Sequence, residues 1–226
     1  LVLKEYNNNF DIGIKELKKL IENFFDNCGF PNSRNPNDLI KISKYMILIR
    51  ESSRDAQSYI PEYLDEIIEK NLNCLNSIKT STRETPLFNG NVESKIDKYL
   101  EYVKSLNYKF KKTRNVIGGL YVLKNKKQNI FFDTGEPPKK SFSNSYQSGP
   151  LSFEYYMNEN KIITNCGFGS QISKKAELLS RLTSAQSTLC LNDTSVTKFE
   201  RNKLINSTFG ALIKNNFRTF DINYIN

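Results

Sequence analysis

The chain has 226 residues, 38% hydrophobic and 25% charged, which is enough apolar material for a sizeable core and excludes wholesale disorder. Its 33 lysine and arginine residues outnumber 24 acidic residues, and the formal charge of +9 favours an anionic partner, although a general bias toward lysine explains the charge equally well. No apolar run approaches the length that spans a bilayer, so we expect no membrane insertion.

Four stretches of the first hundred residues have apolar side chains at helical spacing. Gly29 and Pro31 end the first stretch, and Asn35 then stands as an N-cap with Pro36 at the first helical position. The third stretch begins near Pro61, and the fourth follows the break at 89–90. The apolar positions are Ile14, Leu17, Leu20, Ile21 and Phe24; Leu39, Ile42, Met46 and Ile49; Leu64, Ile67, Ile68, Leu72, Leu75 and Ile78; Val92, Ile96, Tyr99, Leu100 and Val103.

After Leu106 the apolar period changes from helical to twofold. Tyr108 and Phe110 alternate with lysines, and a long loop rich in Gly, Pro, Ser and Asn covers 133–150. Short strands are expected at 120–123, 130–132, 151–157, 161–165, 187–191 and 220–224. We therefore predict an α+β organisation, with stacked helical hairpins over 1–107 and an antiparallel β-sandwich over 108–226 that ends before it closes.

Histidine is absent from the chain, which removes the usual general base near neutral pH and the commonest zinc ligand. The four cysteines stand far apart, without a C-x-x-C pair, at Cys28, Cys74, Cys166 and Cys190. Free buried thiols are the simpler interpretation, and disulfides stay open as the alternative.

Four local strings, in order, resemble the heparinase II/III family. The first runs over 26–36 and resembles an aspartate-glycine turn followed by a Ser-Arg-x-Pro-like stretch. Leu87-Phe88-Asn89-Gly90 resembles a segment before the last toroid helix, and Gly149-Pro150-Leu151-Ser152-Phe153-Glu154 resembles the strand that opens the metal-site region. The fourth string is a pair of segments, 162–167 and 184–189. The order and the helix-then-strand context carry the resemblance across about residues 20 to 195.

The resemblance implies a fold and a reaction class. The family has an (α/α) toroid followed by antiparallel β-sheets, so 1–107 would be the last toroid helices and 108–226 a truncated sandwich. We accordingly expect a C-terminal fragment or processed product that packs on an upstream toroid, located in a bacterial cell envelope or periplasm. Family members cleave uronic-acid-containing polysaccharides by β-elimination, using an Asn, a Tyr and a His, and several hold a structural zinc.

The family's catalytic positions fall on other residue types in this chain. The tyrosine position, two residues after Pro36, falls on Asp38, and the histidine position, six residues before Leu151, falls on Ser145. The catalytic asparagine would lie upstream of Leu1. Whether the chain is an enzyme is therefore left open by the resemblance.

The zinc positions of the family fall on neutral amides, at Gln147, Asn165 and Gln186. Amides bind zinc poorly but form hydrogen bonds with each other readily, so we expect no zinc and no other cofactor. Either an amide network replaces the metal as a brace, or these positions have drifted after their role was lost.

Few side chains remain that could act in acid-base chemistry. Tyr146 is the fallback candidate, but its pKa near 10 would have to be lowered by Lys139 or Lys140. An ordinary loop aromatic is the simpler interpretation of Tyr146. Asp38 is more simply a first-turn helix acid, and Glu154 is expected to face outward from its strand in a structural role.

These patterns leave three functional hypotheses. The first is a lyase acting on an acidic polysaccharide with displaced catalytic groups. The second is a catalytically silent module that binds such a glycan through Arg34, Lys140 and Tyr146, since arginine pairs with carboxylate or sulfate in a bidentate manner. The third is nucleic-acid binding, which has no supporting motif, so we expect no nucleic-acid partner.

Overall fold

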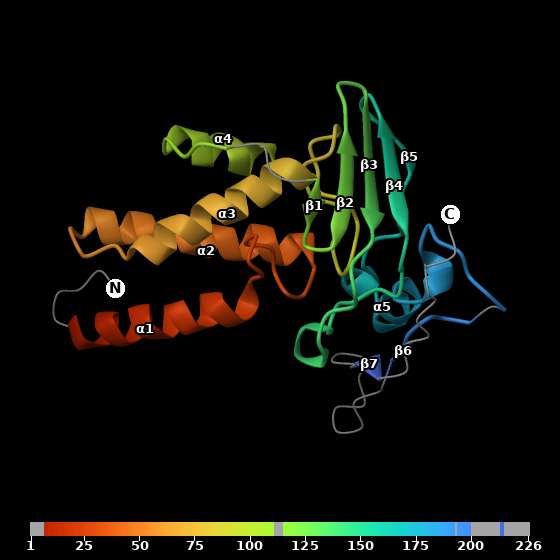
Figure 1. Cartoon of the computed structure of the whole chain (residues 1–226), viewed down its shortest axis with the longest axis horizontal. Helices are drawn as coiled ribbons and strands as arrows, with labels where there is room; N and C mark the ends of the chain where they lie inside the picture. Colours follow the sequence, from red (N-terminus) through yellow and green to blue (C-terminus); the bar gives the residue numbers. More distant parts are fainter. Residues whose placement is uncertain (1–6, 111–114, 193, 200–212, 215–226) are drawn as a thin grey trace.

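The computed structural model describes residues 7–110, 115–192, 194–199 and 213–214 (Figure 1). The helices are α1 (Asn7–Phe24), α2 (Pro36–Asp55), α3 (Glu62–Ile78), α4 (Asp97–Ser105) and α5 (Lys174–Ser180). The strands are β1 (Val116–Ile117), β2 (Leu120–Lys124), β3 (Gln128–Asp133), β4 (Phe153–Met157), β5 (Asn160–Ile163), β6 (Lys198–Phe199) and β7 (Ile213–Lys214). The order of helices first and strands second confirms the predicted change of period.

The turn between α1 and α2 forms as its sequence predicts. The Asp26 side chain accepts hydrogen bonds from the backbone N–H groups of Cys28 and Phe30, and Gly29 adopts a φ of +84°. Asn35 then caps α2, because its extended backbone lets its side chain accept a hydrogen bond from Asn37 N at 2.9 Å. The fourth predicted helix is shorter than expected and begins at Asp97.

Five strands form one antiparallel sheet in the order β1-β2-β3-β4-β5. The strands predicted at 120–123, 130–132, 151–157 and 161–165 are confirmed as β2 to β5, shifted by a few residues. The strand predicted at 187–191 is wrong, because this segment follows a 3-10 turn and forms only an isolated bridge at Leu191. The strand predicted at 220–224 lies outside the described residues. Helix α5 and strands β1, β6 and β7 were not predicted.

The inner face of the sheet packs on the helices (Figure 1). Leu120, Val122, Phe131 and Tyr156 belong to the same buried cluster as the apolar stripes of α2, α3 and α4. The side chain of Glu154 is also on this face and is fully buried, which corrects its predicted outward position. Alternation along a strand separates two faces but does not tell which of them the rest of the molecule covers.

The opposite face of the sheet is apolar and open in the described part of the chain. Val116, Tyr121, Leu123, Met157 and Ile162 are 37–51% exposed, and the core cluster contains no described residue beyond Tyr156. Strands β6 and β7 form a separate two-stranded sheet. The observed layers are therefore helices against a sheet. Within the described ranges, no helix combines the length and apolar character that a membrane crossing requires.

Candidate functional site

The N-terminus of α2 gathers the two predicted catalytic positions. The Asp38 carboxylate, in the first turn, accepts a hydrogen bond from Ser33 Oγ at 2.6 Å. On the other side, Asn35 Nδ2 donates to Ser145 Oγ at 3.3 Å. Burial raises the pKa of Asp38, while the Ser33 hydroxyl and Lys41 lower it. Both positions therefore border one helix N-terminus, although Ser145 follows its partner Asn35 by 110 residues in the chain.

The Asn89-Gly90 turn lies directly against Ser145. Gly90 has a φ of +99°, and a Cβ atom there would lie 2.3 Å from the Ser145 Cβ. The Ser145 hydroxyl donates to the Asn89 carbonyl at 3.2 Å, and Gly90 N donates to Gln147 Oε1 at 2.9 Å. The turn thus connects the predicted histidine position with the first predicted zinc position, and only glycine fits its backbone.

Arg34 joins the turn before α2 to the sheet. Its guanidinium donates to four backbone carbonyls, in 118–119 and 135–136, at 2.9–3.1 Å, and it also pairs with the Asp133 carboxylate. These contacts use all five guanidinium N–H groups. No N–H is left for a ligand, so we assign Arg34 to the fold and remove it from the predicted substrate contacts.

Tyr146 is buried, with 1% of its surface exposed. Burial raises the pKa of its hydroxyl, as does the nearby Asp133 carboxylate, while Arg34 acts in the opposite direction. A tyrosinate base would need a lowered pKa, and the cation that lowers the pKa of Tyr146, Arg34, does not offset its burial. This environment speaks against Tyr146 as a base or a substrate contact. Lys140, by contrast, is exposed in the 3-10 turn Lys140–Phe142.

Two of the predicted amide positions converge on one carbonyl and one thiol. Gln147 Nε2 donates to Ser180 O at 2.8 Å and to Gly167 O at 2.9 Å, and Gln186 Nε2 donates to the same Ser180 oxygen at 2.7 Å. Both amide nitrogens lie 3.8–3.9 Å from Cys166 Sγ. The amides brace the loop ahead of β4 against the end of α5, but through backbone carbonyls instead of through each other.

The third amide, Asn165, connects β5 to the segment after α5. Its Oδ1 accepts hydrogen bonds from the backbone N–H and the hydroxyl of Ser187 at 3.0 and 3.1 Å. The same serine hydroxyl donates to Phe153 O at the start of β4. Ser187 is therefore held beside the sheet by hydrogen bonds that involve side chains. The segment 187–191 does not form the regular backbone hydrogen bonds of the predicted strand.

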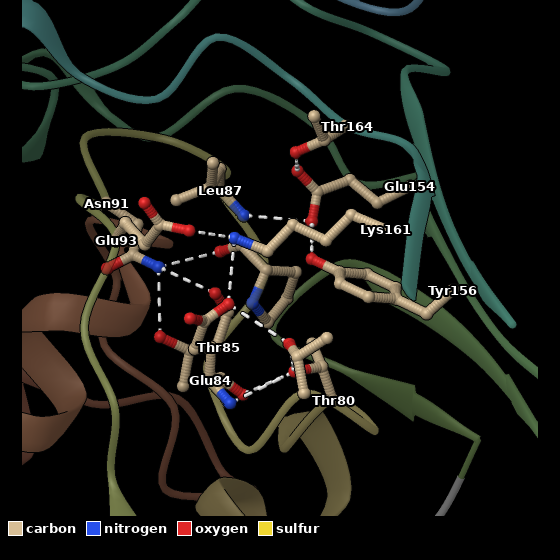
Figure 2. A network of polar contacts seen from close by, with 12 residues as sticks. Thr80, Glu84, Thr85, Leu87, Asn91, Glu93, Glu154, Tyr156, Lys161 and Thr164 are labelled. Atoms are coloured by element: carbon tan, nitrogen blue, oxygen red, sulfur yellow. Dashed lines mark hydrogen bonds and ion pairs between the residues drawn. The ribbon is translucent and has the colours of Figure 1, made fainter. Parts of the chain in front are cut away.

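Glu154 is the centre of a polar network between the sheet and the loop at 84–95 (Figure 2). Its Oε2 accepts hydrogen bonds from Leu87 N at 3.1 Å and from the Tyr156 hydroxyl at 2.6 Å. Its Oε1 accepts from the Thr164 hydroxyl at 3.0 Å and from Asn165 N at 2.9 Å. Burial raises the pKa of Glu154, and these four donors oppose that shift. This role cannot be read from the sequence, because two of the four donors, Leu87 N and Asn165 N, are backbone groups.

Lys161 binds the same loop to the sheet at a half-exposed position. Its ammonium pairs with Glu84 Oε2 at 2.8 Å and with the Glu93 carboxylate (Figure 2). Next to this pair, Asn91 Nδ2 donates to the Thr85 hydroxyl at 2.9 Å and holds the loop together. The loop that carries Gly90 is thus fixed to the sheet by several side chains, and the contacts at Ser145 and Gln147 depend on that position.

The comparisons with known proteins agree with this arrangement. Residues 114–220 match the model of the family described as heparinase II/III-like, C-terminal. Over these residues, just under half of its length, the chain is similar to the C-terminal domain of that family. No curated protein sequence matches the chain.

Solved heparinase III-type structures share the fold of this chain. The heparinase III-BT4657 gene product, with methylated lysines, superposes with a TM-score of 0.70 at 14% identity over 84% of this chain and 34% of that one. The heparan sulfate lyase HepC from Pedobacter heparinus gives 0.66 at 16% identity over 84% and 35%. A further heparinase III structure gives 0.66 at 14% over 84% and 36%. The chain spans about a third of the length of these structures.

The residues at the expected zinc positions do not fit the zinc that several heparinase II/III family members hold. The oxygens of Gln147 and Asn165 accept hydrogen bonds from Gly90 N and Ser187, and both glutamine nitrogens donate to Ser180 O. In the described ranges, no three His, Cys, Asp or Glu side chains form a metal-binding group. The donor atoms are therefore committed within the protein, and zinc has no set of anionic or imidazole ligands.

Proposed function

We propose that this chain is a catalytically silent, acidic-glycan-binding relative of the heparinase II/III-type polysaccharide lyases. In this proposal α1 to α4 are the last helices of an (α/α) toroid, and the five-stranded sheet is the first layer of a β-sandwich. The HepC neighbour is a heparan sulfate lyase. We extend only the class of ligand, an acidic polysaccharide, to this chain, together with a location in a bacterial cell envelope or periplasm.

The observation that carries this proposal is the state of the two predicted catalytic positions. Asp38 and Ser145 border the N-terminus of α2, and both side chains are hydrogen-bonded within the protein. β-Elimination needs a base for the proton beside the uronate carboxylate and an acid for the leaving oxygen. A serine hydroxyl that donates to Asn89 O is poorly suited to either task, because it lacks a neighbouring base.

Glycan binding requires fewer groups than cleavage does. Exposed lysines such as Lys140 and Lys41 supply positive charge that attracts an acidic glycan. The net charge of +9 acts in the same direction. Of the three proposed contacts, Lys140 is kept because its side chain is exposed, whereas Arg34 and Tyr146 are buried.

An active lyase is the second candidate, favoured by the family match over 114–220. It requires catalytic groups other than the family's tyrosine and histidine. The Tyr146 hydroxyl, whose pKa is raised by burial, would have to reach the substrate through a local opening of the 133–150 loop.

Absorbance of the unsaturated uronate product on heparan sulfate separates the two candidates. The parent chain and a Tyr146→Phe variant are both expected to show no product while glycan binding is retained. Loss of one acid-base group costs about 10²–10⁴-fold in rate, so even residual catalysis by a displaced group would be measurable against the uncatalysed reaction. Activity in the parent that disappears in Tyr146→Phe would make the second candidate correct.

A further inference from the structure

Cys28 and Cys74 lie on segments that contact each other, although they are 46 residues apart. The turn with Cys28 rests on α3, where Asn71 Nδ2 donates to Gly29 O at 2.6 Å. A Cβ atom on Gly29 would lie 2.5 Å from the Lys70 Cβ, so the approach is close. Cys74, one helical turn after Lys70, therefore faces the turn and not solvent.

The sulfur of Cys74 already lies against the backbone of Cys28. The thiol donates to the Cys28 carbonyl oxygen at 3.2 Å. A carbonyl oxygen lies about 2.4 Å from its own Cα, so the Cys74 sulfur is within about 5.6 Å of the Cys28 Cα. In a disulfide this separation is about 4 Å, so rotation of the Cys28 side chain and a small shift of the turn are enough.

We propose that Cys28 and Cys74 form a disulfide when the protein meets an oxidised dithiol such as glutathione disulfide. Cys28 is half-exposed and reacts first: its thiolate attacks glutathione disulfide, forms a mixed disulfide and releases one glutathione thiolate. The buried Cys74 then loses its proton to solvent and attacks the Cys28 sulfur, which releases the second glutathione. The protein loses two protons and two electrons, and glutathione disulfide takes up both to give two glutathione thiols.

The environment of Cys74 sets the rate of the second step. The thiol is 2% exposed, and burial raises its pKa, as do Asp26 and Cys28. Only a small fraction is thiolate near neutral pH, so ring closure is slow and accelerates with rising pH. The bond would fix the turn that precedes α2 to α3 by closing a long loop, which stabilises a fold against unfolding.

The test uses a Cys166→Ser/Cys190→Ser background, so that only the two relevant thiols remain. After incubation with glutathione disulfide, peptide mapping without reductant is expected to find a Cys28–Cys74 link, and Tm is expected to rise by several degrees over the reduced protein. The matched control is Cys28→Ser in the same background, which should give neither a link nor a shift. Reduced samples of each variant are compared first, to establish equal folding.

Two results would overturn the proposal. The first is a glutathione adduct that persists on Cys28 at high pH, because it would show that Cys74 cannot reach the sulfur. The second is that both thiols of the folded protein stay unreacted under a treatment that oxidises them in the unfolded chain. The test does not involve glycan binding, so its outcome is independent of the proposed function.

Discussion

Arg34 shows how one side chain can join two parts of this fold. It leaves the turn before α2 and ends among the β1–β2 turn, the segment after β3 and Asp133, with both charged groups almost fully buried. A buried cation is tolerated only when it is paired and all its donors are used, as they are here. The sequence shows a Ser-Arg-x-Pro-like stretch, but the four backbone acceptors belong to distant segments, so sequence reasoning assigned the arginine to a ligand.

Replacement of Arg34 by lysine should destabilise the protein despite the retained charge. Lysine has three donors and no planar fork, so at least two carbonyls lose their partner, and we expect a loss of about 3–5 kcal/mol in the free energy of unfolding. Urea denaturation measures the loss. Arg83→Lys is the matched control, because Arg83 is 66% exposed and should change stability by less than about 0.5 kcal/mol. Equal effects in the two variants would contradict the structural role of Arg34.

At the scale of elements, local patterns were predicted well and the sheet only in part. The Asn35 cap and the apolar helix stripes depend on neighbours within four residues, and the structure confirms them. The strand predicted at 187–191 is wrong. Ser187 forms hydrogen bonds with Phe153 and Asn165, which are more than 20 residues away and so do not appear in a local sequence pattern. The inward orientation of Glu154 likewise depends on a segment distant in the sequence, the loop at 84–95, where Leu87 N donates to its carboxylate.

The Asn89-Gly90 turn gives a test of how the elements meet. Gly90→Ala places a methyl group 2.3 Å from the Ser145 Cβ on a backbone of positive φ, and we expect a loss of about 2–4 kcal/mol. Gly13→Ala is the control: nothing lies within 4 Å, and alanine in a helix should stabilise by about 0.5–1 kcal/mol.

A double variant shows whether the contact with Ser145 causes the effect. Ser145→Gly should remove the clash with Ser145 but neither the close contact with Asn35 Nδ2 at 2.9 Å nor the backbone strain, so Gly90→Ala should cost about 1 kcal/mol less in that background. The same free energy change for Gly90→Ala in both backgrounds, measured by urea unfolding, would mean that Ser145 does not lie where the structure places it.

At the scale of the whole molecule, the similarity to heparinase II/III-like proteins extends to the fold, whereas the residue types at the expected catalytic positions differ. The helix-then-strand order and the heparinase II/III-like match over 114–220 agree with the resemblance carried by the four strings. The family resemblance also assigned Gln147 and Gln186 to one zinc site, and in the structure both side chains donate to Ser180 O. The bonding pattern itself was not predictable, because it uses the Ser180 carbonyl at the end of α5, a helix that the apolar periodicity does not indicate.

Metal analysis tests the loss of the zinc site. We expect less than stoichiometric zinc in the purified protein, and no change in Tm on treatment with a chelator, because the amides of Gln147, Asn165 and Gln186 are bonded to protein groups. Stoichiometric zinc that a chelator removes together with stability would refute this expectation.

The most direct test of the proposed function is a titration with heparan sulfate at rising salt, with dextran as the uncharged control. Between about 0.1 M and 1 M salt the Debye length falls from about 10 Å to about 3 Å, and we expect affinity to weaken at least about tenfold. Lys140→Gln should bind more weakly than the parent, whereas Lys98→Gln, on α4, should bind as the parent does. Absence of binding at low salt, or equal binding of dextran, would contradict a glycan-binding module.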